Sequence, residues 1–98
     1  MDKVTNGFRM FLEQTEGVGP AFMQAVQKQA EVSALDEKTR ELAYIAVLVT
    51  ARMHGGLPFH VDRARQLGAT EGEIRGAMLV PLPVIGIQAA EALPYIGG

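Results

Sequence analysis

The run from Leu42 to Ala51 constrains the fold of this 98-residue chain more than any other stretch. Thr50 is its only fully polar residue, since Tyr44 is amphipathic. A helix that is apolar on nearly all sides belongs inside a core, with other elements around it. Asp36 upstream is a good N-cap residue, because its carboxylate can accept hydrogen bonds from the first turn. The sequence therefore predicts a buried central helix that begins just after Asp36.

A second helix is predicted directly after this segment. Gly55 and Gly56 are expected to supply the conformational freedom for the C-cap of the central helix, and Pro58 suits the first turn of the next one. The sequence LPFHVDRARQLG is amphipathic, and Gly68 is a natural C-cap. One stripe of this helix carries Leu57, His60, Val61, Ala64 and Leu67. We therefore expect two consecutive helices that form a central antiparallel hairpin.

Helical periodicity extends to both ends of the chain, and no strand-like alternation interrupts it. Apolar faces recur within residues 4–12 and 22–30, on either side of the breaking sequence EGVGP. Thr70 and Glu73 form a capping box that starts a helix running to about Val80. Prolines then break or restart the chain, and a last helix runs toward Pro94. We expect about six short helices in one all-α domain spanning residues 1–98.

Composition excludes several classes of function. A net charge of −2 argues against a nucleic-acid partner, which would need a clustered basic face. The chain has no cysteine, so it has neither disulfides nor a thiolate nucleophile, and a cytoplasmic location is expected. The N-terminal residues lack the apolar core of a signal peptide, and the apolar runs are too short or too interrupted to span a bilayer. A chain this short with 48% apolar residues is also expected to associate with other copies.

The sequence MHGGLPFH, from Met53 to His60, holds both histidines of the chain. Metal binding would require them to join Glu41 or Asp62, but they lie six positions apart across a Gly-Gly-Pro break, so we expect no metal. Proton transfer is the second possibility, because His60 lies on an apolar stripe and needs a polar partner that Glu41 could provide. A purely structural interpretation also remains open: a solvated first-turn glutamate and a hydrogen-bonded core histidine.

The segment Leu35–Ile74, LDEKTRELAYIAVLVTARMHGGLPFHVDRARQLGATEGEI, resembles the carboxymuconolactone decarboxylase and alkylhydroperoxidase D superfamily. The resemblance implies an alkylhydroperoxidase D-like helical bundle that assembles as a trimer or hexamer. In the peroxidase branch, a glutamate and a histidine flank a CxxC pair. Carried over by spacing, the glutamate falls on Glu41 and the histidine on His60. The cysteine positions fall on Met53 and Gly56, neither of which can attack a peroxide or form a disulfide.

Three functions follow from this resemblance. The first is a cysteine-less enzyme that decarboxylates or isomerises a small organic acid or lactone without a cofactor, with His60 as general acid/base and Glu41 orienting it. Candidate substrate-binding residues are Arg52 and His54, which would hold a carboxylate, and Met53 and Gly56, where the glycines leave space for a ligand. The second is a non-catalytic small-molecule-binding or scaffold oligomer. The third, an alkylhydroperoxidase, is disfavoured by the missing thiols.

Overall fold

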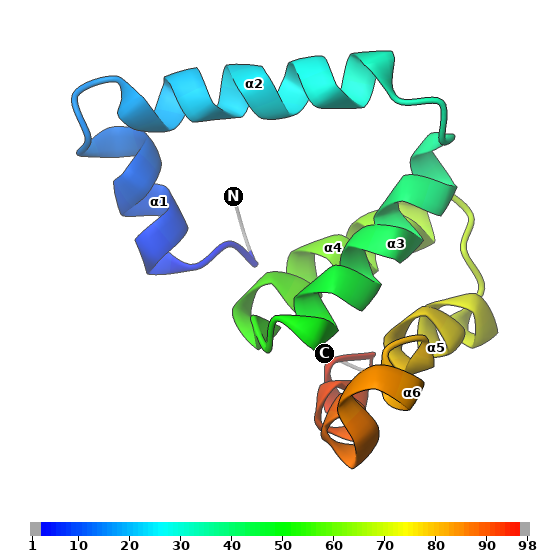
Figure 1. The fold of residues 1–98 in the computed structure, drawn as a ribbon. Helices are drawn as coiled ribbons and strands as arrows, with labels where there is room; N and C mark the ends of the chain where they lie inside the picture. Colours follow the sequence, from blue (N-terminus) through cyan, green and yellow to red (C-terminus); the bar gives the residue numbers. More distant parts are fainter. Residues whose placement is uncertain (1–2, 97–98) are drawn as a thin grey trace.

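The computed structural model describes residues 3–96, and within this range the chain is helical with no strand (Figure 1). Five α-helices have eight residues or more, and a sixth has only four. The elements are α1 (Asn6–Glu13), α2 (Val18–Val32), α3 (Glu37–Thr50), the 3₁₀ turn η1 (His54–Gly56), α4 (Leu57–Gln66), α5 (Glu71–Leu79), α6 (Leu82–Ile85) and the 3₁₀ segment η2 (Gly86–Ile96). The all-α prediction is confirmed.

The hydrophobic core lies between α3, α4, α5 and η2. Helices α3 and α4 form the antiparallel hairpin predicted from the sequence, and α5 packs against both α3 and η2 (Figure 1). The largest side chains that are fully buried are Ile45, Leu57, Ile74, Met78, Val49 and Val61. They come from α3, α4 and α5, so the hairpin and the helix after it share one core.

Local capping contacts explain where the core helices begin. The Asp36 carboxylate accepts a hydrogen bond from the Thr39 backbone N–H at 2.7 Å, and this bond lowers the pKa of Asp36. At the start of α5, the Thr70 hydroxyl accepts from the Glu73 N–H, and the Glu73 carboxylate accepts from the Thr70 N–H. The Thr70 N–H, together with Lys38, lowers the pKa of Glu73. Both predicted helix starts are therefore confirmed.

Ion pairs on the surface join the helices around this core. Lys38 of α3 lies 3.1 Å from Glu73 of α5. Arg65 of α4 holds Glu71 of α5 through two hydrogen bonds of 2.8 and 2.7 Å, and it also donates to the Ile96 carbonyl. The Glu71 bond raises the pKa of Arg65 and lowers that of Glu71. Through these hydrogen bonds, Arg65 links the end of η2 to α4 and to the start of α5.

Helix α3 is buried on one side only, which differs from the sequence prediction of a helix covered nearly all round. Ile45, Leu48 and Val49 are buried, whereas Val47 is 64% exposed and Tyr44 is 44% exposed. The reason is the number of neighbours: α4 and α5 cover one face, and no other described element of the same chain covers the opposite face. The apolar residues of that face remain on the surface of the single chain.

Helices α1 and α2 form a unit that we call the α1–α2 arch (Figure 1). It passes over the α3–α4 hairpin, and the two ends of the arch are the parts that approach the core. Phe11 and Phe22 pack edge to face, with ring centroids 5.6 Å apart. Gly19 is the only buried residue of α2, and a Cβ there would lie 2.8 Å from the Leu12 Cα, so the close approach of the two helices requires glycine. Helix α1 has no buried residue.

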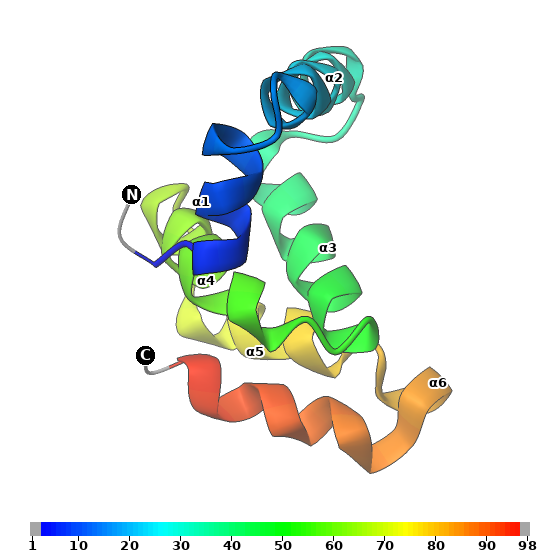
Figure 2. The same cartoon turned by 90° about the vertical axis from the view of Figure 1, so that its left-hand side faces the viewer.

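The segment Glu71–Ile96 has the length and composition to cross a membrane, with a mean hydropathy of 1.5 in its most apolar window. Only 28% of that window is buried within the chain. The segment bends at α6, however, and η2 runs back alongside α5 (Figure 2). It therefore forms a folded-back pair of short elements in place of one straight helix, and the predicted lack of membrane association stays a prediction.

Candidate active site at the Glu41 and His60 pair

Glu41 of α3 and His60 of α4 are in direct contact. The Glu41 Oε2 lies 2.7 Å from the His60 Nδ1, and the two side chains are 17% and 18% exposed. The sequence prediction that His60 is mostly buried and within hydrogen-bond reach of Glu41 is confirmed. An ionised carboxylate can only accept hydrogen bonds, so Nδ1 must be the donor. The contact therefore selects the form of the imidazole that carries its proton on Nδ1.

The second ring nitrogen of His60, Nε2, remains open to solvent. It has no hydrogen-bond partner among the described residues. Within residues 3–96, no buried side-chain nitrogen or oxygen lacks a partner, so an unpaired Nε2 must be accessible. With Nδ1 donating to Glu41, Nε2 carries the lone pair. The arrangement leaves a basic nitrogen accessible while a carboxylate holds the other nitrogen of the ring, which is the pairing that a general base requires.

A second ion pair continues the same face of the hairpin. Glu37, one turn before Glu41 on α3, lies 3.3 Å from Arg63, one turn after His60 on α4. The two contacts run in opposite order along the two helices, as the antiparallel arrangement demands. Residues three or four apart share a helix face, so Glu37 and Glu41, four apart on α3, can face Arg63 and His60, three apart on α4. The two contacts are consistent with one register of the antiparallel hairpin.

Two aromatic rings surround the His60 imidazole, and the sequence analysis assigned neither to the site. The Tyr44 ring stacks on it, with centroids 3.9 Å apart and planes inclined by 16°. The Phe59 ring meets it edge on, at 5.1 Å and 75°. Tyr44 follows Glu41 by three positions, a spacing that places both on one face of α3. That spacing was the available signal in the sequence.

The other predicted site residues lie at the turn between α3 and α4. His54 is half-buried, and its ring lies 5.2 Å from that of Tyr95 in η2. Met53 is 62% exposed. Hydrogen bonds and ring contacts among the described residues join neither His54 nor Arg52 to His60. The structure therefore brings together Glu41 and His60 but leaves these residues on the adjoining surface.

The two glycines of the turn do not leave open space, in contrast to the expectation from the sequence. A Cβ built on Gly56 would lie 3.1 Å from the Leu48 Cδ2. A Cβ built on Gly55 would lie 3.0 Å from the Thr5 Cγ2. The Leu48 side chain therefore occupies the volume beside Gly56, whereas Gly55 is exposed and meets only the Thr5 methyl group.

Arg52 terminates α3, so the prediction that Gly55 and Gly56 would do so is wrong. Arg52 adopts a left-handed conformation with φ of +59°. The Met53 N–H donates to the Leu48 carbonyl and the Arg52 N–H to the Val49 carbonyl, which is the hydrogen-bond pattern of a Schellman motif. The left-handed position of that motif usually holds glycine, because a Cβ there costs about 1–2 kcal/mol. The Arg52 side chain has no hydrogen bond or ion pair among the described residues.

Replacing Arg52 with glycine is expected to stabilise the protein by about 0.5–1 kcal/mol, because relief of the left-handed strain exceeds the added entropy of the unfolded chain. Urea denaturation would measure the change. Arg52→Ala is the matched control, since it removes the guanidinium and keeps the strain, so its stability should stay within about 0.5 kcal/mol of the wild type. Destabilisation by Arg52→Gly would contradict this account of the turn.

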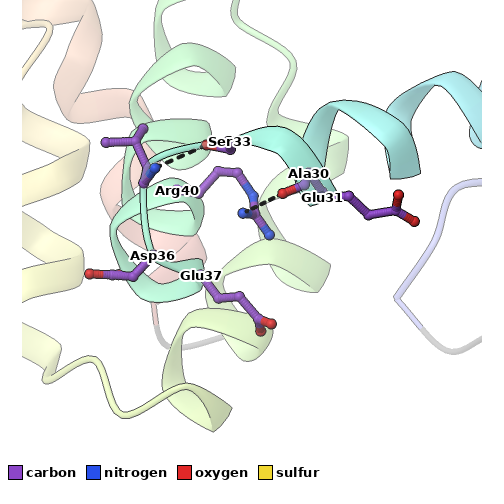
Figure 3. Close-up of a pocket in the computed structure, with 7 residues that line it drawn as sticks. Ala30, Glu31, Ser33, Asp36, Glu37 and Arg40 are labelled. Carbon is purple, nitrogen blue, oxygen red and sulfur yellow. Dashed lines mark hydrogen bonds between the residues drawn. The ribbon is translucent and has the colours of Figure 1, made fainter.

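A depression of about 400 Å³ lies where α2 joins α3, and it is shallow and open (Figure 3). Arg40 extends across it and donates to the Ala30 carbonyl at 3.4 Å, and the Leu35 N–H donates to the Ser33 hydroxyl. Glu37 also lines it. The depression is separate from His60, which is not among its lining residues.

No group of three or more His, Asp or Glu side chains within residues 3–96 is placed to hold a metal ion. His54 packs on Tyr95, and His60 packs on Tyr44 and contacts Glu41. The two histidines thus have separate surroundings, and the dyad of one carboxylate and one imidazole suits proton transfer.

Comparison with known proteins agrees with the helical fold. The model of the carboxymuconolactone decarboxylase family matches residues 17–95, which include α2 to α6 and nearly all of η2. Neither a curated protein nor a solved structure matches the chain. The matched range contains Glu41, His60 and the turn between them. With a match over most of its length, the chain belongs to the carboxymuconolactone decarboxylase family.

Proposed function

We propose that the protein catalyses acid/base chemistry, decarboxylation or isomerisation, on a small organic acid or lactone. The observation that carries the proposal is the 2.7 Å contact between Glu41 and the His60 Nδ1, combined with an Nε2 that has no partner among the described residues and is not fully buried. Membership of the carboxymuconolactone decarboxylase family supports the substrate class. The chain has no cysteine, so a peroxidase mechanism that depends on a thiolate is disfavoured.

The two residues divide the work of proton transfer. The Nε2 lone pair of His60 removes a proton from carbon or oxygen of the substrate and later returns it to the product. The Glu41 carboxylate holds the ring by Nδ1 and stabilises the imidazolium that forms in between. Arg52 is proposed to bind the substrate carboxylate, because its guanidinium has no partner among the described residues and lies on the adjoining turn. The proposed chemistry needs no cofactor.

Incubation with carboxymuconolactone tests this function directly. Loss of the lactone and release of carbon dioxide would be followed by proton NMR and by trapping of the gas. The same experiment in D₂O reports isomerisation, because a proton removed by His60 is replaced by deuterium from solvent. Turnover that requires both Glu41 and His60 would support the proposal. An unchanged substrate with no deuterium incorporation would exclude this lactone, and the same outcome across related small lactones and oxo acids would exclude the function.

A non-catalytic binding or scaffold oligomer is the second candidate function. The filled turn favours it, since Leu48 and Thr5 occupy the volume beside Gly56 and Gly55. The location of the depression favours it too, because that depression lies at the α2–α3 junction instead of over His60. In that case the Glu41–His60 contact would serve only to fasten α4 to α3.

We also propose that the protein works as a homo-oligomer, a trimer or hexamer, in the cytoplasm, without a nucleic-acid or membrane partner. Large apolar side chains remain exposed on three parts of the single chain: the arch, α3 and the region around α6. The exposed set includes Val18, Phe22, Val32, Tyr44, Val47, Val80, Val84 and Ile87. Monomeric proteins rarely expose apolar surface in contiguous patches, so a second copy is the proposed cover.

Light scattering coupled to size exclusion is expected to show a stable oligomer at micromolar concentration. The 10.6 kDa chain makes a monomer, a trimer and a hexamer easy to distinguish. Val84→Lys should weaken the assembly, because a charge on an 82% exposed valine costs little in the monomer and much in a dry interface. A monomer at that concentration would refute the proposal.

A further inference from the structure

We propose that Tyr44 is a positioning residue, whose ring holds the His60 imidazole so that Nδ1 faces Glu41 and Nε2 faces the substrate. The inference rests on the proposed acid/base function and extends it to a residue on the neighbouring helix. Neither the family match nor the sequence analysis assigns a role to Tyr44. The contact that carries the proposal is the stack of the two rings, at 3.9 Å and 16°.

The stack restricts a motion that the Glu41 hydrogen bond alone leaves possible. An imidazole has a broad torsion about its bond to Cβ, so its plane can swing and carry Nδ1 away from Glu41. The hydrogen bond to Glu41 fixes the position of one atom of the imidazole, Nδ1. The Tyr44 ring lies flat on the imidazole and also fixes the plane of that ring. Phe59 meets the imidazole edge on at 75° and so blocks rotation from another direction. Together the two aromatic rings hold the plane of the imidazole, and the Glu41 hydrogen bond selects the edge that faces the carboxylate.

The geometry also suits the charge that His60 would carry during turnover. Neutral aromatic rings prefer offset stacks or edge-to-face packing to a perfect face-to-face sandwich. A cation over the face of a tyrosine is attracted by the electron density of the ring. The contact of Tyr44 with His60 therefore stays attractive when Nε2 takes a proton from the substrate.

Tyr44 is otherwise a weak candidate for a purely structural role. Its side chain is 44% exposed, so it contributes less to the core than the buried Ile45 next to it. It has no hydrogen bond among the described residues, and the His60 ring is its only aromatic neighbour there. The contact with His60 is thus the main interaction that the structure gives this side chain.

Nitrogen NMR of the ¹⁵N-labelled full-length protein tests the proposal without a substrate. Free histidine favours the form protonated on Nε2, whereas the contact with Glu41 requires the proton on Nδ1. Spectra at about pH 8.5, above the usual titration range of histidine, report which nitrogen carries the proton. In the wild type, His60 should be protonated on Nδ1. In Tyr44→Leu, the ratio of the Nδ1–H to the Nε2–H form should fall by roughly 2- to 12-fold, the population factor that an aromatic pair can impose.

Two controls make the comparison specific. Tyr44→Phe retains the ring and should keep the wild-type ratio, which separates stacking from any effect of the hydroxyl. Tyr95→Leu removes the ring beside His54, so it should alter the His54 signals and leave those of His60 unchanged. His54 also serves in every spectrum as a second histidine that Tyr44 does not contact, and its unchanged signals in Tyr44→Leu would show that the fold is intact.

The NMR ratio tests the positioning role of Tyr44 independently of the proposed enzymatic function. A wild-type ratio in Tyr44→Leu, or loss of the ratio in Tyr44→Phe, would overturn the positioning role. If the ratio responds as expected but no lactone or oxo acid is turned over, the positioning of His60 stands and the enzymatic function fails. If turnover occurs, Tyr44→Leu should lower kcat by a similar factor and Tyr44→Phe should leave it near the wild-type value.

Discussion

Replacing His60 with glutamine is expected to lower the rate of turnover of a lactone substrate by about 10²–10⁴-fold, the usual contribution of a general acid/base. Glutamine has a similar size and can still hydrogen-bond to Glu41, but it cannot take up a proton at neutral pH. The fold should therefore survive. Measurements of kcat on carboxymuconolactone, or of deuterium incorporation where that reaction is absent, would check the prediction.

The controls for this variant come from the same chain. His54→Gln makes the same chemical change at the other histidine and should have a much smaller effect, because His54 contacts Tyr95 and not the dyad. Glu41→Gln should also lower kcat, since it removes the charge that stabilises the imidazolium. A purely structural pair would behave differently: His60→Gln would then leave any activity intact.

Replacing Ile74 with alanine is expected to reduce the free energy of unfolding by about 2–5 kcal/mol, because it opens a cavity in a close-packed core. Ile74 is fully buried at the centre of the cluster formed by α3, α4, α5 and η2. A domain of this size has a total stability of about 5–15 kcal/mol, so the loss removes a large share of it. Urea denaturation at a fixed protein concentration would measure the change.

Val47→Ala provides the matched comparison for Ile74→Ala. It also removes methyl groups from a β-branched residue, but Val47 is 64% exposed in the single chain. Its effect on a monomer should stay within about 0.5 kcal/mol. If the protein assembles through this face of α3, the effect should grow, and it should do so only at concentrations where the oligomer forms. Equal losses in the two variants at all concentrations would contradict the core described above.

The elements of the fold could be predicted because local signals carry them. Asp36, Thr70 and Glu73 cap helices through contacts within one turn, and those contacts appear in the structure as the sequence predicts. The contact of Glu41 with His60 was predicted from two sources, the apolar stripe of α4 and the family resemblance. The stripe turns His60 toward the core, and the resemblance pairs it with Glu41, but the register that lets the two side chains meet comes from the packing of the hairpin.

The features that the sequence did not predict depend on neighbours that periodicity cannot identify. The apolar run of α3 predicts a helix that is covered all round, yet Val47 is exposed, because burial depends on how many elements surround a helix. The pair Gly55 and Gly56 predicts a C-cap, yet Arg52 holds the left-handed position. Glycine permits a left-handed conformation but does not require it. The left-handed residue of the Schellman motif of α3 is Arg52, three residues before Gly55. The stack of Tyr44 on His60 depends on the crossing of two helices.

The way the α1–α2 arch is attached has a consequence for how the protein opens. The contacts at its ends include the Lys3 to Asp62 ion pair at 3.4 Å, with both side chains about two-fifths exposed, and the Arg40 bond to the Ala30 carbonyl. Exposed ion pairs of this kind contribute about 0–1 kcal/mol. Amide hydrogens of α1 and α2 in an isolated chain should therefore exchange with solvent through a local opening, at a free energy well below that of the core. The arch is thus a separate cooperative unit. A second copy of the chain could bind the arch while the helices that carry Glu41 and His60 stay folded.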